Sequence, residues 1–171
     1  MPKKIVIFGA SSPVEGDEEY NLAYEVGKLI GELGFTVING GYIGTMEASS
    51  KGAKENGGKA IGVTSKTLTY SPPNKYNDEV MEAEDLFERI RIMVEMGDAF
   101  VVLKGSTGTL TELLHAWEHL NMGKTNAPVI CFGSHWKNIT EQLDNGRKAI
   151  PLKELKFVDS LEELREVLAN I

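Results

Sequence analysis

A glycine-rich turn at residues 105–112 (GSTGTLTE) is the first candidate for a site that could do chemistry. It follows the apolar run 98–103 and leads into a segment whose apolar residues recur with helical spacing. Glycines let the backbone come close to a ligand, and the unpaired N–H groups and the dipole at the start of a helix favour an anion. A second turn of this kind, residues 41–45, follows the apolar run 35–38. Two such turns facing a common crevice would suit a nucleotide or a similar phosphorylated ligand.

Glu112 lies one helical turn beyond the 105–109 turn, and two roles are open to it. Its spacing from Thr109 matches a capping box, in which the carboxylate would accept a hydrogen bond from the Thr109 N–H. A carboxylate at this height above a bound phosphate would also reach the attached sugar, where it could activate water or stabilise positive charge on a ribosyl ring. The spacing alone supports both roles.

The elements that must position these turns alternate between strand and helix along the chain. Short runs rich in Val, Ile and Phe, without polar alternation, are typical of parallel strands covered on both faces. They predict strands at residues 4–8, 35–38, 59–63, 78–81, 98–103 and 128–132. The first helix is expected to end at Gly34, a residue type that favours helix C-termini. This order predicts an α/β fold with a three-layer, doubly wound parallel sheet of the Rossmann-like type, as a single domain over residues 1–171.

In such a sheet, ligands bind at the carboxyl ends of the strands, where the predicted turns fall. The candidate ligand-binding residues of these turns are Gly9, Ser11, Gly41, Gly44, Thr45, Gly105, Ser106, Thr107, Gly108 and Thr109. The polar segment 65–77 is a loop of unusual length, which could form a lid or a surface excursion.

Composition and charge exclude several functional classes. The net charge of −7, from 25 acidic and 18 basic residues, argues against a nucleic-acid partner. The apolar runs are too short for a signal peptide or a membrane span, so we expect a cytoplasmic protein without a membrane partner. Cys131 is the only cysteine and lies in an apolar run, which predicts core packing instead of a nucleophilic role.

Familiar cofactor and metal motifs are absent or incomplete. The first turn lacks the GxGxxG pattern, and Asn39 stands where a dinucleotide fold would place an acid, so NAD binding is disfavoured. The GKT sequence at 123–125 is not a P-loop, because position 118 is Glu118 instead of glycine. His115 and His119 match the HxxEH zinc pattern, but a helical wheel places them nearly opposite the predicted buried stripe. That stripe consists of Leu110, Leu113, Leu114, Trp117 and Leu120. We therefore expect no metal ion and no organic cofactor.

Several segments together resemble the signatures of the LOG family, once described as lysine decarboxylases. Arg89 and Met93 match the family's R-K-x-x-M motif, and residues 105–114 match P-G-G-x-G-T-x-x-E. The upstream segments 8–12, 39–41 and 57–63 agree in order and spacing, so that the resemblance runs from residue 3 to about residue 133.

The resemblance implies a Rossmann-like homodimer that hydrolyses the N-glycosidic bond of nucleoside 5′-monophosphates, notably cytokinin ribotides. The products of that reaction are the free base and ribose 5-phosphate. Residue by residue, the resemblance implies that Glu112 and Arg89 form the catalytic pair and that residues 106–109 hold the phosphate.

The chain departs from the LOG pattern at three positions near the expected site. Ile90 replaces the family's lysine, Lys104 replaces its proline, and Ser106 replaces its second glycine. Arg91 and Lys104 are the candidates to replace the charge of the lost lysine. Arg91 is not an obvious substitute, because it lies about 200° from Arg89 around an ideal helix.

Two alternatives remain open at this stage. Proteins that carry molybdenum cofactor have a similar fold and resemble the chain at residues 51–58 (KGAKENGG), which leaves a binding protein without hydrolase activity as the rival function. For Arg89, the alternative role is a solvated ion pair with one of the acids nearby in sequence. Those acids are Glu82, Glu84, Asp85 and Glu88.

The helix expected at residues 85–96 carries the prediction of a homodimer. Its apolar stripe, predicted to cover the sheet, consists of Leu86, Phe87, Ile90, Met93 and Val94. Ile92 lies about 160° from the centre of that stripe and would be left in water. Because the LOG resemblance also places this helix against its symmetry mate, we expect the helix to form part of a dimer interface.

Overall fold

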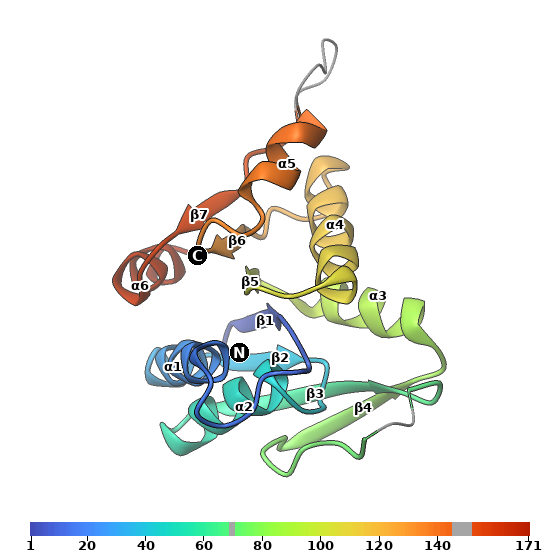
Figure 1. The fold of residues 1–171 in the computed structure, drawn as a ribbon, viewed down its shortest axis with the longest axis vertical. Coiled ribbons are helices and arrows are strands. Elements are labelled where there is room, and N and C mark those ends of the chain that lie inside the picture. Colours follow the sequence, from blue (N-terminus) through green and yellow to red (C-terminus); the bar gives the residue numbers. More distant parts are fainter. Residues whose placement is uncertain (69–70, 145–151) are drawn as a thin grey trace.

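The computed structural model describes residues 1–68, 71–144 and 152–171 (Figure 1). Seven parallel strands form one sheet in the order β4-β3-β2-β1-β5-β6-β7, with helices on both faces. The strands are β1 (Lys4–Phe8), β2 (Thr36–Asn39), β3 (Lys59–Ser65), β4 (Glu79–Ala83), β5 (Ala99–Val102), β6 (Val129–Phe132) and β7 (Lys156–Val158). The helices are α1 (Glu18–Glu32), α2 (Thr45–Glu55), α3 (Leu86–Met96), α4 (Thr107–Asn121), α5 (Lys137–Asp144) and α6 (Leu161–Ala169). The fold is the doubly wound, Rossmann-like α/β architecture that the sequence predicted.

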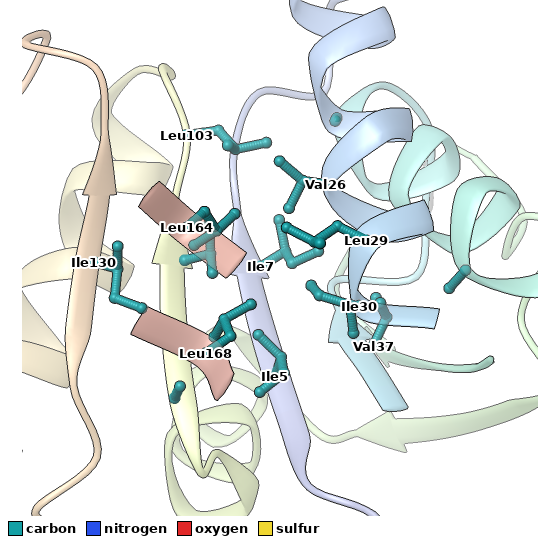
Figure 2. Close-up of a cluster of buried hydrophobic side chains, with 14 of the residues drawn as sticks. Ile5, Ile7, Val26, Leu29, Ile30, Val37, Leu103, Ile130, Leu164 and Leu168 are labelled. Carbon is teal, nitrogen blue, oxygen red and sulfur yellow. The ribbon is translucent and has the colours of Figure 1, made fainter. Parts of the chain in front are cut away.

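The sheet buries a separate apolar cluster on each face. On one face, side chains of α1, α2 and α6 pack against alternate residues of the central strands, as Figure 2 shows for Val26, Leu164 and Ile7. On the other face, α3 and α4 cover Val6, Phe8 and their neighbours in the sheet. Because both faces are covered, the central strands are apolar at nearly every position and lack a polar alternation.

The pattern of apolar runs located most of the sheet. Six strands lie within two residues of their expected ends, and Gly34 follows α1 with a φ of +73°, as a left-handed terminating residue should. The seventh strand, β7, was not predicted. It has only three residues, of which Val158 alone is buried, so it presents no apolar run to detect.

The helical stripes were only partly correct. Phe87 is 77% exposed and Leu86 and Leu114 are also exposed, although the helical wheel placed all three against the sheet. Ile92, expected in water, is instead partly buried against the second apolar cluster. A helical wheel gives the direction in which a side chain leaves its helix axis. The neighbouring elements decide whether a side chain in that direction is buried or exposed.

The remaining structural expectations concern single residues. Cys131 is fully buried in β6, and burial raises the pKa of its thiol to about 12, which confirms core packing. His115 and His119 are half-buried with ring centroids 4.9 Å apart, and the described residues contain no group of three potential ligands for a metal ion around them. No helix within the described ranges is long and apolar enough to span a membrane.

Candidate active site

A cavity of about 180 Å³ lies at the carboxyl ends of the central strands and brings the predicted catalytic pair together. The turn after β1, the first turns of α4 and one side of α3 form its walls (Figure 1). Its lining includes Arg89 and Glu112, together with Gly9, Ser11, Ser106, Gly108 and Thr109 from the predicted turns. The walls also contain four apolar side chains that the sequence did not predict as ligand-binding residues: Met46, Leu68, Leu86 and Ile90.

Helix α4 directs its N-terminus at this cavity. Ser106 is the N-cap residue, and the first intrahelical bond runs from Leu110 N to Ser106 O at 2.9 Å. The N–H groups of Thr107, Gly108 and Thr109 precede that bond and so have no acceptor within the helix. These three groups, together with the helix dipole, form a potential anion site at the mouth of the cavity.

The glycines of the 105–108 turn serve different purposes. A Cβ at Gly105 would lie 2.1 Å from Thr109 Oγ1, so the turn can close against Thr109 only with glycine at this position. A Cβ at Gly108 would meet no heavy atom within 4 Å, because this residue faces open space at the cavity. Gly108 is therefore a position where a side chain can be added without disturbing the protein.

The capping role considered for Glu112 is wrong. Because α4 begins at Thr107, Thr109 is inside the first turn and is not the N-cap residue that a capping box requires. The Glu112 side chain instead faces α3, where its Oε1 lies 3.5 Å from Nη1 of Arg89.

Arg89 is a buried residue with several fixed contacts. It is 5% exposed, and its Nε donates a hydrogen bond of 2.6 Å to the carbonyl oxygen of Val63 at the end of β3. Its guanidinium carbon lies 5.7 Å from the centre of the Tyr42 ring. A Cβ at position 40 would lie 1.6 Å from Nη2, so Gly40 leaves the room that the guanidinium occupies. The alternative of a solvated ion pair for Arg89 is therefore wrong.

Burial makes Glu112 a titrating group near neutral pH. The residue is 9% exposed, and loss of solvation raises the pKa of its carboxyl group to about 7, against an opposing, lowering influence of Arg89. Near neutral pH both protonation states are populated, which is the condition that suits a general acid or base. A carboxylate perturbed in this way inside a cavity is typical of a functional site.

The raised pKa of Glu112 predicts a pH-dependent stability. Between the ordinary pKa of 4.5 and the folded value of about 7, the folded protein holds a proton that the unfolded chain has released, so stability falls as pH rises through this window. Glu112→Gln removes the titration. We expect the free energy of unfolding of this variant, relative to wild type, to be greater at pH 8 than at pH 5 by roughly 1–3 kcal/mol.

Urea unfolding at both pH values measures this difference. Glu118→Gln is the matched control, because Glu118 lies on the same helix and is exposed. Parallel pH profiles for wild type and Glu112→Gln would contradict the proposed perturbation.

The second glycine turn, residues 41–45, does not line the cavity but contacts the turn after β1, which does. Thr45 donates hydrogen bonds of 2.9 Å from both N and Oγ1 to the carbonyl oxygen of Ala10. Gly44 has a φ of +73°, and a Cβ there would lie 2.5 Å from that same oxygen. Gly41 accepts hydrogen bonds from Asn74. Gly41, Gly44 and Thr45 thus fix the shape of the Gly9–Ser11 turn and the following loop, whereas the sequence suggested direct contact with a ligand.

A larger chamber of about 470 Å³ adjoins the cavity on the other side of the α4 N-terminus. The two spaces share Ala10, Ser11 and Ser106. Lys104, which replaces the family's proline, lines this chamber and pairs with Glu19 at 2.9 Å. Sites for small molecules usually occupy about 300–1,000 Å³, so the cavity and chamber together are of the size expected for a nucleotide-like ligand.

Two other features do not belong to this site. Arg91 pairs with Glu88 and Glu95 on the exposed side of α3, so it does not replace the lysine that Ile90 has displaced. Another cavity, of about 700 Å³, opens at the amino ends of the strands, and neither Arg89 nor Glu112 lines it. We assign the candidate site to the smaller cavity because it contains the buried pair of Arg89 and Glu112.

Comparison with known proteins shows the family of this chain. Residues 2–158 match the model of the SLOG cluster4 family. The chain belongs to the SLOG cluster4 family. This SLOG protein is 35% identical over 128 residues to the cytokinin riboside 5′-monophosphate phosphoribohydrolase of Mycobacterium tuberculosis, covering 74% of this chain and 68% of the relative. The enzyme of the same name from Mycobacterium marinum is 28% identical over 174 residues, covering 96% and 92% of the two chains. The resemblance to LOG proteins is thereby confirmed.

The fold of this SLOG protein also occurs in a protein of another described function. The molybdenum cofactor binding protein from Rippkaea orientalis superposes with a TM-score of 0.80 over 99% of this chain and 97% of its own, at 23% sequence identity. At this identity the similarity shows the shared fold alone.

Proposed function

We propose that the protein hydrolyses the N-glycosidic bond of a nucleoside 5′-monophosphate, releasing a free base and ribose 5-phosphate. The observation that carries the proposal is the buried pair of Arg89 and Glu112 beside the first turn of α4. The Glu112 carboxyl group titrates near neutral pH. It lies close enough to the anion site at the α4 N-terminus to reach the sugar of a nucleotide whose phosphate is bound there. Phosphoribohydrolases among the relatives support the same chemistry.

The mechanism follows from the positions of these groups. The phosphate binds to the N–H groups of residues 107–109, which anchors the ribosyl ring next to Glu112. As the glycosidic bond lengthens, the ribosyl ring gains oxocarbenium character, and the Glu112 carboxylate stabilises that positive charge. The carboxylate accepts a proton from the attacking water as the water oxygen bonds to the anomeric carbon. The base leaves with the electron pair of the glycosidic bond, and the proton passes from Glu112 to the base, so that the carboxylate is ionised again. Only the ionised form of Glu112 performs both steps, so activity should rise with pH through the region of its pKa.

Arg89 holds the carboxylate in place for this reaction. Its Nε is occupied by the Val63 carbonyl oxygen, which fixes the plane of the guanidinium and directs Nη1 towards Glu112. Nη2 contacts the Met46 sulfur at 3.8 Å, and the N–H donors not engaged by Val63, Glu112 or Met46 can bind a ribose hydroxyl. The apolar wall formed by Met46, Leu68 and Leu86 offers a surface of the right character for the departing base.

A direct assay tests the proposal. Purified protein is incubated with a panel of nucleoside 5′-monophosphates, and the release of ribose 5-phosphate is measured. Release of this product supports hydrolysis. Tight binding without release would instead favour a carrier, the alternative suggested by the fold shared with the molybdenum cofactor binding protein.

The anion site can be tested at Gly108, where a new side chain meets open space. Gly108→Asp places a carboxylate among the N–H groups that would hold the phosphate, and we expect KM for a monophosphate to rise at least about tenfold. Gly108→Asn is the control, because it adds the same volume without the charge. Equal KM values for the two variants would show that the phosphate does not bind at this turn.

We further propose that the protein acts as a homodimer through α3 and α4. Phe87 is 77% exposed, and Leu86 and Leu114 form exposed apolar surface on the same two helices. Leu86 also lines the catalytic cavity, so a second copy of the chain on this surface would complete the cavity wall. Exposed apolar area beside an open cavity is typical of an interaction surface.

Phe87→Asp tests the dimer more cleanly than a change at Ile92, which packs against the core. A charged residue at the centre of an apolar interface is costly to bury, so we expect a monomer by light scattering, with lower activity. Val14→Asp is the control, because Val14 is exposed on a different part of the molecule. A wild-type protein that is monomeric at micromolar concentration would contradict the proposal.

A further inference from the structure

Tyr42 connects the catalytic arginine to the segment that follows β3. Its side chain is 2% exposed, although it lies in the turn between β2 and α2. One face of the ring lies beneath the Arg89 guanidinium, with 5.7 Å between the guanidinium carbon and the ring centre. A cation over an aromatic face at this distance is attracted to it, and the attraction is greater away from water.

The hydroxyl group of the same side chain binds the backbone after β3. It accepts a hydrogen bond from Ser65 N at 3.0 Å, and it lies 3.1 Å from the carbonyl oxygens of both Ser65 and Leu68, to which it can donate. Leu68 is part of the catalytic cavity wall. One buried side chain therefore touches two parts of the cavity that are far apart in sequence.

The backbone of Tyr42 is itself held firmly. The Asn39 side chain accepts a hydrogen bond of 2.8 Å from Gly41 N, and the Asn74 side chain donates one of 2.8 Å to the Tyr42 carbonyl oxygen. Asn77 donates another, of 2.9 Å, to the carbonyl oxygen of Gly41. With its backbone fixed by the hydrogen bonds of these amide side chains, the tyrosine ring can act as a rigid support.

We propose that Tyr42 is a positioning residue for the reaction: its ring holds Arg89 against Glu112, and its hydroxyl holds Leu68 in the cavity wall. The kinetic consequences rest on the proposed function, whereas the positions of Arg89 and Leu68 do not. The two halves of the side chain therefore have separable effects, because the ring acts on the catalytic pair and the hydroxyl acts on the wall that contacts the ligand.

Two substitutions separate these effects. Tyr42→Leu removes the ring, so Arg89 is less well held and its lowering influence on the Glu112 pKa weakens. We expect that pKa to rise by about half a unit or more and kcat to fall about tenfold or more. Tyr42→Phe keeps the ring and removes the hydroxyl. We expect the Glu112 pKa and kcat to stay close to wild type, while the dissociation constant for adenosine monophosphate rises about threefold or more.

The experiment combines carbon-13 NMR titration of the Glu112 carboxyl, calorimetric binding of adenosine monophosphate, and steady-state kinetics. Tyr24→Phe is the matched control, since it removes a hydroxyl that bonds Glu55 on the exposed surface. An unchanged Glu112 pKa in a folded Tyr42→Leu protein would overturn the inference. If that variant does not fold, unchanged affinity in Tyr42→Phe, or a shifted Glu112 pKa there, overturns it equally. If the wild-type protein releases no ribose 5-phosphate, the proposed function fails, and the NMR and binding results still decide the role of Tyr42.

Discussion

Glu112→Gln is expected to lower kcat for a nucleoside 5′-monophosphate by about a thousandfold or more while the dissociation constant changes little. A positioned general base contributes roughly 10²–10⁴ in rate, and the glutamine amide can neither accept the proton of the attacking water nor carry the charge that stabilises a ribosyl cation. Binding should survive, because the phosphate is held by the backbone of the α4 N-terminus and the apolar walls are untouched. Product release assayed beside calorimetric binding measures both quantities.

The matched control for this change is Glu118→Gln, about 1.7 turns further along α4 and on its exposed side. It alters the charge of the protein equally and should leave kcat unchanged. An unchanged rate in Glu112→Gln would show that Glu112 takes no part in the reaction and that its buried ion pair with Arg89 is only structural.

Arg89→Lys is expected to lower kcat about a hundredfold although the positive charge is retained. The guanidinium bonds the Val63 carbonyl oxygen through Nε while Nη1 faces Glu112, and a single ammonium group cannot serve both directions at these distances. The carboxylate would lose its fixed orientation, and misplaced catalytic groups reduce rates steeply. The pH dependence of kcat/KM should also change, because the charge that lowers the Glu112 pKa moves.

Arg91→Lys provides the comparison for Arg89→Lys. Arg91 lies on the same helix, half exposed, in ion pairs with Glu88 and Glu95. Exposed pairs of this kind contribute about 0–1 kcal/mol, so activity and stability should remain near wild type. Full activity in Arg89→Lys would show that charge alone, without the planar guanidinium, supports the reaction.

The sequence alone predicted the elements whose patterns are local. Apolar runs predicted the central strands, because a strand covered on both faces needs apolar residues at successive positions. Gly34 predicted the end of α1 for an equally local reason, the cost of a left-handed backbone for other residues. The glycine turn at residues 105–108 and its family motifs predicted Glu112 and Arg89 as site residues, and the structure brings these two together.

Properties that depend on several segments were not accessible in this way. The helical wheel did not predict the burial of Phe87, Ile92 and Leu114, because the coverage of each side chain depends on elements distant in sequence. The capping role of Glu112 failed for a related reason. A threonine followed three residues later by glutamate forms a box only if the helix begins at that threonine, and the α4 backbone begins two residues earlier.

The sequence by itself therefore determined six of the seven strands, the turns at their carboxyl ends and the types of residue at the site. Tertiary structure decided their chemical state and their partners. The raised pKa of Glu112 comes from burial of its carboxyl group, and the orientation of Arg89 comes from the Val63 carbonyl oxygen and the Tyr42 ring. Solvation and contact distance are sums over atoms brought together by folding, and so no pattern within a single segment contains them.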